Sequence, residues 1–315
     1  MPPFSATKSL SYEKKSKDMK KSLGYFLVIF ASVSWGFIGV FNRMLASTGI
    51  NVWTRMCIRN TGSLVLCLVL FSIFKRSVFR INPRHLPMFF CSGVLGIVGA
   101  TVTYMSCQMM CSLAVAGILL YLAPTFVVLA SAVLWKAPLT PRRVAAVVLA
   151  LIGCAFVSGV VGGSLTASLP GLLLGIGSGL CYGGYTIFSH YNLARYDAYT
   201  SFFWSIAMAG LVSLAGFNAQ EMATVFSQPK GILGALGLVV IGTVLPFLTY
   251  TIGLTAIESG LASVIANVEP VTAAVLGVVL FHETLTVWTM VGIVLVLTAA
   301  VMLAVGEKKK VQEAT

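Results

Sequence analysis

Charged residues are scarce in this sequence. Asp, Glu, Lys and Arg make up 10% of its 315 residues, and only 9 residues are acidic. In soluble domains about a quarter of the residues are charged. Hydrophobic residues instead reach 58%, and the mean hydropathy is +0.94. The shortage of charge therefore excludes an ordinary soluble domain and predicts that most of the chain lies in a lipid bilayer.

Patterns that mark several other protein classes are missing as well. The apolar stretches lack the alternation, over segments of about ten residues, that is typical of a membrane β-barrel. None of the 7 Cys residues has a CxxC spacing, so neither a disulfide framework nor a zinc site is expected. The 3 His residues lie near helix ends, and there is no HExxH motif or nucleophile elbow. We therefore predict a protein that is not an enzyme and holds no metal or other cofactor.

Long apolar runs are what the sequence has in abundance. A membrane-spanning helix needs about 20 apolar residues, and backbone at membrane depth must satisfy its hydrogen bonds within helices. The sequence thus predicts an all-α integral membrane protein with ten transmembrane helices. The expected ranges are 23–43, 51–74, 86–108, 110–135, 143–162, 170–189, 198–217, 231–255, 258–281 and 285–305.

The 21 Lys and Arg residues are distributed unevenly along the chain. If the N-terminus is cytoplasmic, most of them fall in cytoplasmic segments, including the basic segment 1–22 and the tail 306–315. The positive-inside rule then places both termini in the cytoplasm. It also explains the formal charge of +12 without a nucleic-acid partner. We expect the first apolar run to be an uncleaved span and not a signal peptide, because it continues past a short hydrophobic region.

A glycine-rich stretch, "GIGSGLCYGG" (175–184), superficially resembles a phosphate-binding loop. However, no strand precedes it and no Lys follows it, as such a loop requires. Gly175, Gly179 and Gly183 instead recur at every fourth residue. This spacing lets two membrane helices approach closely, so it predicts a helix-packing face.

The second half of the sequence is related to the first by an offset of 146 residues. The related residues are Tyr104 with Tyr250, Pro124 with Pro270 and, at an offset of 147, Trp35 with Tyr182. Each half contains five expected spans, so we predict two inverted repeats, residues 23–162 (helices 1–5) and 163–305 (helices 6–10). Chance similarity between apolar helices accounts for stray Leu and Val matches, but not readily for paired Tyr and Pro at one offset. Inverted repeats are typical of carriers that work by alternating access.

Three stretches resemble the drug/metabolite transporter superfamily, specifically its ten-helix carriers with two EamA-type repeats. They are "SVSWGFIGVFNR" (32–43), "LAPTFVVLASAVLWKAPLT" (122–140) and "VEPVTAAVLGVVLFHETLT" (268–286), together with Arg55 and Arg59 early in the second span. The sequence departs from the family pattern at Lys136-Ala137, where Gly-Glu is common, whereas Glu283 keeps the family acid in the second repeat. The resemblance implies a multi-pass carrier in a bacterial cytoplasmic membrane, often an exporter of amino acids or related metabolites, with a central cavity. The expected partners are the lipid bilayer and a small-molecule substrate, with a proton or a counter-solute as a coupling partner.

Aromatic and polar side chains near the middle of the spans are the candidate substrate-binding residues. A pocket for a small molecule needs apolar walls with a few polar groups, and such residues would suit a zwitterion with an apolar side chain. Simple packing between helices is the alternative for each aromatic residue. The candidates are Trp35, Arg59, Tyr104, Tyr121, Tyr182, Trp204, Tyr250, Asn267 and Glu269.

Glu269 is the most informative of these, because a charge at membrane depth is costly and usually faces protein or water. Three roles remain open for it: binding a substrate ammonium group, carrying a coupling proton, or pairing with an Arg such as Arg59. Pro270 follows it directly, and Pro124 takes the same place in the first repeat. Since a proline inside a helix removes a backbone hydrogen bond and kinks the helix, we expect both prolines to kink helices that line the site.

The sequence therefore predicts a secondary-active transporter of small organic metabolites that exports an amino acid or a related compound. Transport of a drug, nucleoside or sugar is an alternative within the same class. A membrane receptor or accessory protein that keeps the fold without moving a solute is an alternative from another class, and a channel is a third.

Overall fold

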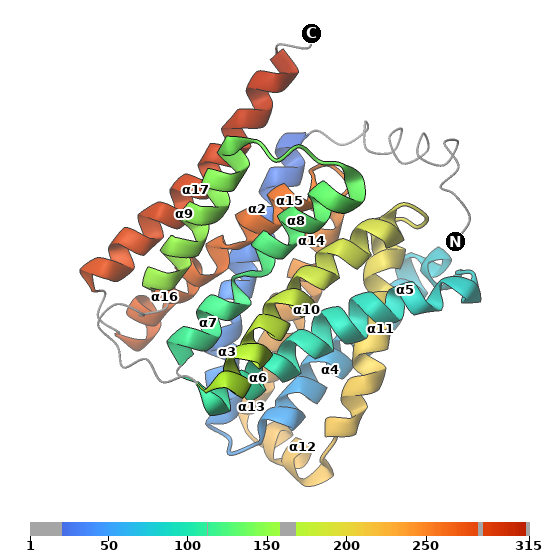
Figure 1. Cartoon of the computed structure of the whole chain (residues 1–315). Helices are drawn as coiled ribbons and strands as arrows, with labels where there is room; N and C mark the ends of the chain where they lie inside the picture. The colour runs from blue at the N-terminus through green and yellow to red at the C-terminus, as the bar shows by residue number, and fades with distance from the viewer. Residues whose placement is uncertain (1–20, 112, 158–167, 283–285, 313–315) are drawn as a thin grey trace. The chain divides into compact units, whose positions relative to one another are not determined.

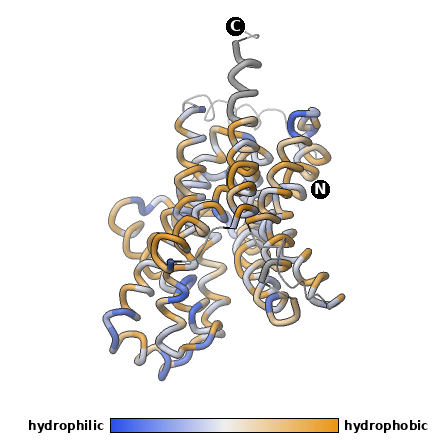
Figure 2. Tube along the Cα trace, turned by 90° about the vertical axis from the view of Figure 1, so that its left-hand side faces the viewer, coloured by the Kyte–Doolittle hydropathy of each residue, from blue (hydrophilic) through white to orange (hydrophobic). Residues whose placement is uncertain are grey.

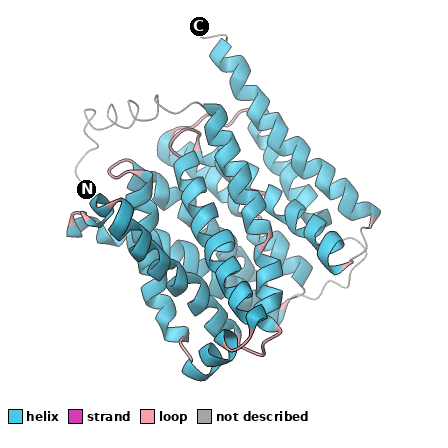
Figure 3. Ribbon diagram, turned by 180° about the vertical axis from the view of Figure 1, so that it is seen from behind, coloured by secondary structure: helices cyan, strands magenta, loops and turns pink. Residues whose placement is uncertain are grey.

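The computed structural model describes residues 21–111, 113–157, 168–282 and 286–312, and the side chains of 113–114 and 303–312 are not described. The described residues form helices joined by short turns, and no strand element occurs among them (Figures 1 and 3). Most of the residues along these helices are hydrophobic, as the orange colour in Figure 2 shows. The predicted all-helical class is confirmed for this part of the chain. The N-terminal residues 1–20, Glu283 and the side chains of Lys308, Lys309 and Lys310 lie outside the description.

Eight helical stretches are long and apolar enough to cross a membrane, and they coincide with eight of the ten predicted spans. They are Lys21–Ala46, Val52–Phe74, Pro83–Met110, Val115–Trp135, Leu169–Leu193, Ala198–Gly216, Pro229–Gly253 and Ser259–Phe281. The predicted span 285–305 contains a shorter apolar helix, Val287–Met302, and the predicted span 143–162 overlaps a helix of 17 residues. The count of ten spans and the cytoplasmic placement of the termini stay predictions.

The chain divides into two compact units, each of which takes segments from both halves of the sequence. Unit 1 comprises Met1–Val98 and Phe188–Glu258, and unit 2 comprises Gly99–Ile187 and Ser259–Thr315. The α-helices of unit 1 are α2 (Lys21–Gly36), α3 (Ile38–Ala46), α4 (Val52–Phe74), α5 (Leu86–Phe90), α11 (Ala198–Ser213), α12 (Ala219–Phe226), α13 (Pro229–Val239) and α14 (Leu245–Gly253). Unit 1 also holds the 3₁₀ turns η1 (Arg76–Phe79), η2 (Pro83–His85) and η4 (Leu214–Gly216), the π-helix η5 (Val240–Val244) and most of the π-helix η3 (Cys91–Gly99).

Unit 2 holds α6 (Ala100–Met110), α7 (Leu113–Leu120), α8 (Ala123–Trp135), α9 (Pro141–Val157), most of α10 (Leu169–Leu193), α15 (Ser259–Ala266), α16 (Val268–Phe281) and α17 (Val287–Gln312). Within unit 1, α2 packs on α14, α3 on α13 and α4 on α11. Within unit 2, α9 packs on α17 and α8 on α15. Partners far apart in the sequence therefore build each unit.

Glycines of α10 allow close helix contacts in unit 2. A Cβ atom at Gly179 of α10 would lie 2.6 Å from the Leu119 carbonyl oxygen, and one at Gly183 would lie 3.2 Å from the Ala123 carbonyl oxygen. A Cβ at Gly175 would collide with the Leu119 side chain. Such glycines let the backbones of membrane helices touch. The structure thus confirms that this glycine face serves helix packing.

Irregular backbone recurs at the same offset as the sequence repeat. The π-helix η5 spans 240–244, and residues 94–98, which precede them by 146, lie in the π-helix η3. The junction between α7 and α8 includes Tyr121, and the junction between α15 and α16 falls at its counterpart Asn267. Lys136 and His282, another related pair, both end a helix in the left-handed region, each with φ of 54°. The repeat relation therefore extends from residue types to local backbone geometry.

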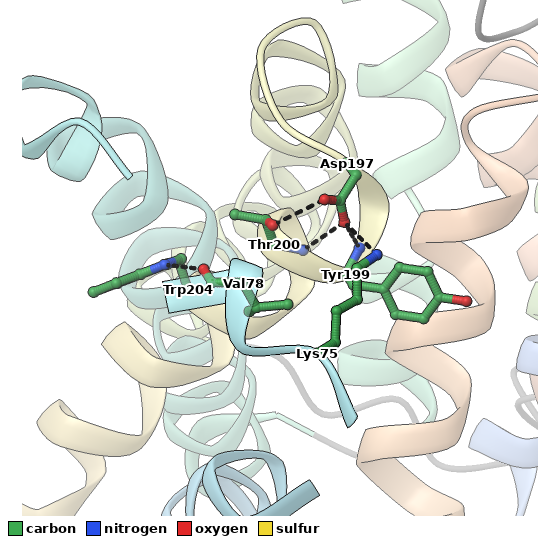
Figure 4. Close-up of polar contacts among 6 residues, drawn as sticks. All are labelled: Lys75, Val78, Asp197, Tyr199, Thr200 and Trp204. Carbon is green, nitrogen blue, oxygen red and sulfur yellow. Dashed lines mark hydrogen bonds and ion pairs between the residues drawn. The ribbon is translucent and has the colours of Figure 1, made fainter. Parts of the chain in front are cut away.

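A polar cluster in unit 1 joins the end of α4 to the start of α11 (Figure 4). Asp197 caps α11 by accepting hydrogen bonds from the backbone N–H groups of Tyr199 (2.9 Å) and Thr200 (3.1 Å). The Lys75 ammonium lies 3.3 Å from the same carboxylate and 3.8 Å from the centre of the Tyr199 ring. Burial raises the pKa of Asp197, but the hydrogen bonds from Thr200 and the charge of Lys75 outweigh it, so the net pKa lies below its ordinary value of 3.8.

Asp197→Ala is expected to lower the stability of the protein by about 1 kcal/mol, because it removes the cap of α11. Asp197→Asn keeps a capping oxygen and removes only the charge. A carboxylate whose folded-state pKa is depressed contributes stability above its unfolded pKa and loses it as the pH falls through the folded value. Thermal melts in detergent should therefore show wild type above Asp197→Asn at neutral pH, and the two should converge as the pH drops below 3.8. A difference in melting temperature between wild type and Asp197→Asn that stays the same at every pH would contradict this role of the charge.

Candidate functional site

Glu269 lies in the first turn of α16, directly after an interruption of the ninth predicted span. Helix α15 ends at Ala266, Asn267 stands at the junction, and α16 begins at Val268. Pro270 lacks the N–H group that would continue the hydrogen bonding across this point. The N-terminus of a helix favours a negative charge. The break in the helix thus provides a suitable position for a carboxylate within an apolar span.

Three tyrosines from three different segments of unit 2 lie near this carboxylate. The Tyr182 hydroxyl of α10 donates a hydrogen bond of 3.0 Å to Glu269 Oε2. Tyr104 of α6 and Tyr121 of the α7–α8 junction both lie within electrostatic range of Glu269, and Tyr121 is also within range of the other two tyrosines. All four side chains are partly exposed. The arrangement is a partly exposed carboxylate with phenol groups near it.

The surroundings of this phenol-carboxylate cluster (Tyr104, Tyr121, Tyr182 and Glu269) are mostly apolar. Tyr121 packs against the buried residues Cys154, Val271 and Val296. Tyr104 packs against Cys107, Cys111 and Ala116. Apolar walls with a few polar groups are typical of a small-molecule site.

The two repeats have related helix junctions, between α7 and α8 and between α15 and α16. Pro124 and Pro270 follow these junctions, and Asn267 lies in the second. Asn267 is 2% exposed, and its Nδ2 atom has no hydrogen-bond partner within the described part of the chain. Pro124 lies in the first turn of α8, and Pro270 takes the related place in α16. Both interruptions therefore occur where a proline removes a donor, next to Tyr121 in one repeat and next to Glu269 in the other.

A second group of predicted residues meets in unit 1. The Trp35 ring centre lies 5.2 Å from that of Phe247 and 5.3 Å from that of Tyr250. Arg59 Nε donates a hydrogen bond of 3.1 Å to Thr243 Oγ1, and its guanidinium carbon lies 6.0 Å from the centre of the Phe247 ring. Trp35 and Tyr250 are 3% and 2% exposed. Within unit 1 these two aromatic side chains are core residues, as the packing alternative predicts.

The repeat relation connects the two groups. Trp35 and Tyr250, which touch in unit 1, are the repeat counterparts of Tyr182 and Tyr104, which lie around Glu269 in unit 2. Arg59 and Glu269 belong to different units, so their pairing stays a prediction. The repeats have thus kept paired aromatic positions while only one of them carries an acid.

Trp204 has a partner outside both groups. Its indole N–H donates a hydrogen bond of 3.0 Å to the carbonyl oxygen of Val78 in the turn η1 (Figure 4). A buried indole N–H needs such an acceptor. This hydrogen bond satisfies the indole N–H of Trp204 from within the protein, so the N–H does not need a substrate as its acceptor.

Thr243 is the site residue that the sequence analysis did not single out. It is fully buried, accepts the hydrogen bond from Arg59 and donates one of 2.8 Å to the Leu238 carbonyl oxygen, five residues earlier. The second bond lies within the turn where the helix widens into η5. The residue 146 positions earlier, in the first repeat, is Ile97. This difference, a hydroxyl in one repeat and an apolar side chain in the other, is the feature of the sequence that could have pointed to Thr243.

Within the described residues, no group of three or more His, Cys, Asp or Glu side chains could hold a metal ion. The donors around Glu269 are phenol oxygens, which suit hydrogen bonding and contact with organic cations.

The helices and their hydropathy define a multi-pass membrane protein. The EamA-like transporter family matches the sequence twice, at residues 22–159 and 169–305. The chain therefore belongs to the EamA-like transporter family.

Similar proteins agree with this assignment. An uncharacterized inner membrane transporter, YicL of Salmonella typhimurium, is 26% identical over 299 residues, which make up 92% of this chain and 98% of that protein. An uncharacterized transporter of Archaeoglobus fulgidus is 28% identical over 205 residues, or 64% of this chain and 70% of that one. A protein of known crystal structure with 20% identity superposes with a TM-score of 0.75 over 92% of this chain and 99% of its own, which shows the shared fold.

Proposed function

We propose that this protein is a secondary-active carrier that exports an amino acid or a related small organic metabolite by alternating access. Membership of the EamA-like transporter family supports transport, and the backbone irregularities shared at one offset support a duplicated, inverted architecture. We place it in the bacterial cytoplasmic membrane with both termini inside, in line with the inner membrane location in the name of its Salmonella relative.

The observation that carries the proposal is the hydrogen bond from Tyr182 to Glu269 at the break between α15 and α16. It holds a carboxylate at membrane depth, next to a helix interruption and among partly exposed phenols. An ionisable group inside a span is costly, and in membrane proteins it commonly marks a substrate or ion pathway. Packing alone would be served by an apolar residue, such as Ala123 at the related position of the first repeat.

Transport should be measured with purified protein in proteoliposomes. A thermal-shift screen against amino acids, nucleosides, sugars and amines would select candidates, and counterflow would show which of them are carried. Glu269→Gln and Glu269→Ala are expected to lower the initial rate at least about tenfold, which corresponds to the loss of one charged hydrogen-bonding contact.

Glu221→Gln is the matched control, because Glu221 is a carboxylate of α12 that binds Asn51 and lies outside the cluster. It should transport like wild type. Unchanged rates, affinity and coupling in both well-folded Glu269 variants would remove this residue from the mechanism, and counterflow with no compound at all would contradict the carrier itself.

A further inference from the structure

Two short connections between helices meet on one side of unit 1. Residues 75–82 and residues 194–197 each join two consecutive membrane-crossing helices. The backbone N–H of Asn82 donates a hydrogen bond of 3.0 Å to the Tyr196 hydroxyl, so the two connections are in contact. Because each connection is only a few residues long, both lie where the helices leave the membrane.

Exposed arginines gather along these two connections. Arg76 and Arg80 lie in the first, Arg84 lies in the turn η2 directly after it, and Arg195 lies in the second. All four side chains are exposed. Arg195 Nη1 lies 3.6 Å from Met88 Sδ, so Arg195 stands next to the helix that follows η2. We call Arg76, Arg80, Arg84 and Arg195 the arginine surface.

The acid within the two connections does not neutralise this charge. Asp197 is the single acidic residue in them, and the Lys75 ammonium lies 3.3 Å from its carboxylate (Figure 4). The same carboxylate accepts hydrogen bonds from backbone N–H groups at the start of α11. None of the four arginines forms an ion pair within the part of the chain that the structure describes. The arginine surface therefore keeps its positive charge for a partner.

The backbone of the first connection is held against other parts of unit 1. Val78 is fully buried, and its carbonyl oxygen accepts a hydrogen bond of 3.0 Å from the Trp204 indole (Figure 4). The Tyr196 hydroxyl lies 2.7 Å from His85 Nδ1. The chain is thus fixed on both sides of Arg80. A partner that binds the folded form of this surface would stabilise the unit.

Apolar side chains at the ends of the neighbouring helices set the depth of the arginine surface. Ile73 and Phe74, the last residues of α4, are 67% and 78% exposed, and Phe90 is 46% exposed. Apolar side chains of a membrane helix face the acyl chains, and arginines next to them reach the level of the lipid headgroups. A guanidinium can bind two oxygens of one phosphate. The charge and the depth therefore fit a lipid phosphate.

We propose that the arginine surface binds the phosphate headgroups of anionic phospholipids and that this binding stabilises unit 1. Basic residues beside a membrane helix are attracted to anionic lipid, and each contributes roughly fivefold in affinity. The interaction goes beyond the proposed carrier function, because it requires no transported solute. It also holds for either orientation of the protein in the membrane.

A lipid titration of the purified full chain in detergent micelles tests this proposal. Phosphatidylglycerol should raise the thermal unfolding midpoint by at least about 2 °C at saturation. Phosphatidylcholine, which has no net charge, should raise it much less at the same mole fraction. Equal stabilisation by phosphatidylcholine would overturn the proposal. Stabilisation by soluble polyglutamate as strong as by phosphatidylglycerol would also overturn it and would favour an acidic protein partner.

A double variant, Arg80→Gln with Arg84→Gln, tests the residues. It should need at least about tenfold more phosphatidylglycerol for half of the maximal shift. Both side chains are exposed, so without anionic lipid its unfolding midpoint should equal that of wild type, which checks the fold. A double variant that responds to phosphatidylglycerol like wild type would overturn the proposal.

Lys230→Gln is the control for the general effect of charge. Lys230 is an exposed residue of unit 1 at the start of α13, beyond the far end of α11. Its variant should respond to phosphatidylglycerol within about twofold of wild type, whereas Arg80→Gln alone should respond about fivefold more weakly. An equal loss in these two single variants would show that net charge, and not the arginine surface, attracts the lipid. The assay contains no solute, so its failure leaves the proposed carrier function untouched.

Discussion

Gly179→Ala should destabilise the protein by about 1–3 kcal/mol, although the new side chain is a single methyl group. The added Cβ would lie 2.6 Å from the carbonyl oxygen of Leu119, a backbone atom that cannot move aside without shifting α7. Helix α10 would have to separate from its neighbour and lose packing contacts that substitute for a hydrophobic driving force inside the bilayer. The measurement is the thermal unfolding midpoint in detergent, together with the yield of monodisperse protein.

Gly177→Ala is the matched control on the same helix. A Cβ at Gly177 would meet no atom within 4 Å, so only the higher helix propensity of alanine acts, and it favours the variant by up to about 1 kcal/mol. The two variants make the same chemical change two residues apart. If both raised the melting temperature equally, close contact between α10 and α7 would not be limiting for stability.

Thr243→Val should cost about 1.5–3 kcal/mol even though the two side chains have nearly the same shape. The hydroxyl accepts a hydrogen bond from Arg59 Nε and donates one to the Leu238 carbonyl oxygen, and the residue is fully buried. Valine would remove both bonds at once and leave the charged donor without this acceptor. Thermal unfolding of the purified variant measures the effect.

Thr243→Ser separates the hydroxyl from the methyl group. Serine keeps both hydrogen bonds and removes one buried methyl, which costs about 0.5–1.5 kcal/mol. We therefore expect the smaller residue to be the better replacement, which is the reverse of the order expected from packing alone. A serine variant less stable than the valine variant would show that volume, and not the hydrogen bond from Arg59, sets the requirement at this position.

The helices and part of the candidate site could be predicted because they depend on local patterns. Apolar runs long enough to cross a membrane predicted eight helices at the positions where the structure has them. This is possible because the bilayer fixes both the length and the hydropathy of a spanning helix. The recurrence of Gly175, Gly179 and Gly183 at every fourth residue predicted a face for helix packing, because residues four apart lie on the same side of a helix. Tyr182, Tyr104 and Glu269 were selected by the repeat and by the cost of a buried charge, and the structure brings them together.

The remaining contacts depend on which segments meet in space. Trp204 was assigned to a cavity from its depth alone, but its N–H meets Val78 in a turn that lies over a hundred residues earlier in the sequence. Thr243 was passed over because its role depends on the widened turn η5, and a threonine in an apolar run does not reveal such a turn. Each compact unit also combines segments from both sequence repeats. A comparison of the two halves of the sequence cannot reveal this division, because it does not show which segments pack together.

The division into units has a consequence for biosynthesis. In unit 1, α2, the first of the described helices in the chain, packs on α14, which is among the last parts of that unit to be made. The ribosome makes most of unit 2 before it reaches Phe188, and the rest after Glu258. The early spans must therefore wait in the membrane without their final neighbours, and neither unit can close until translation has passed well into the second repeat.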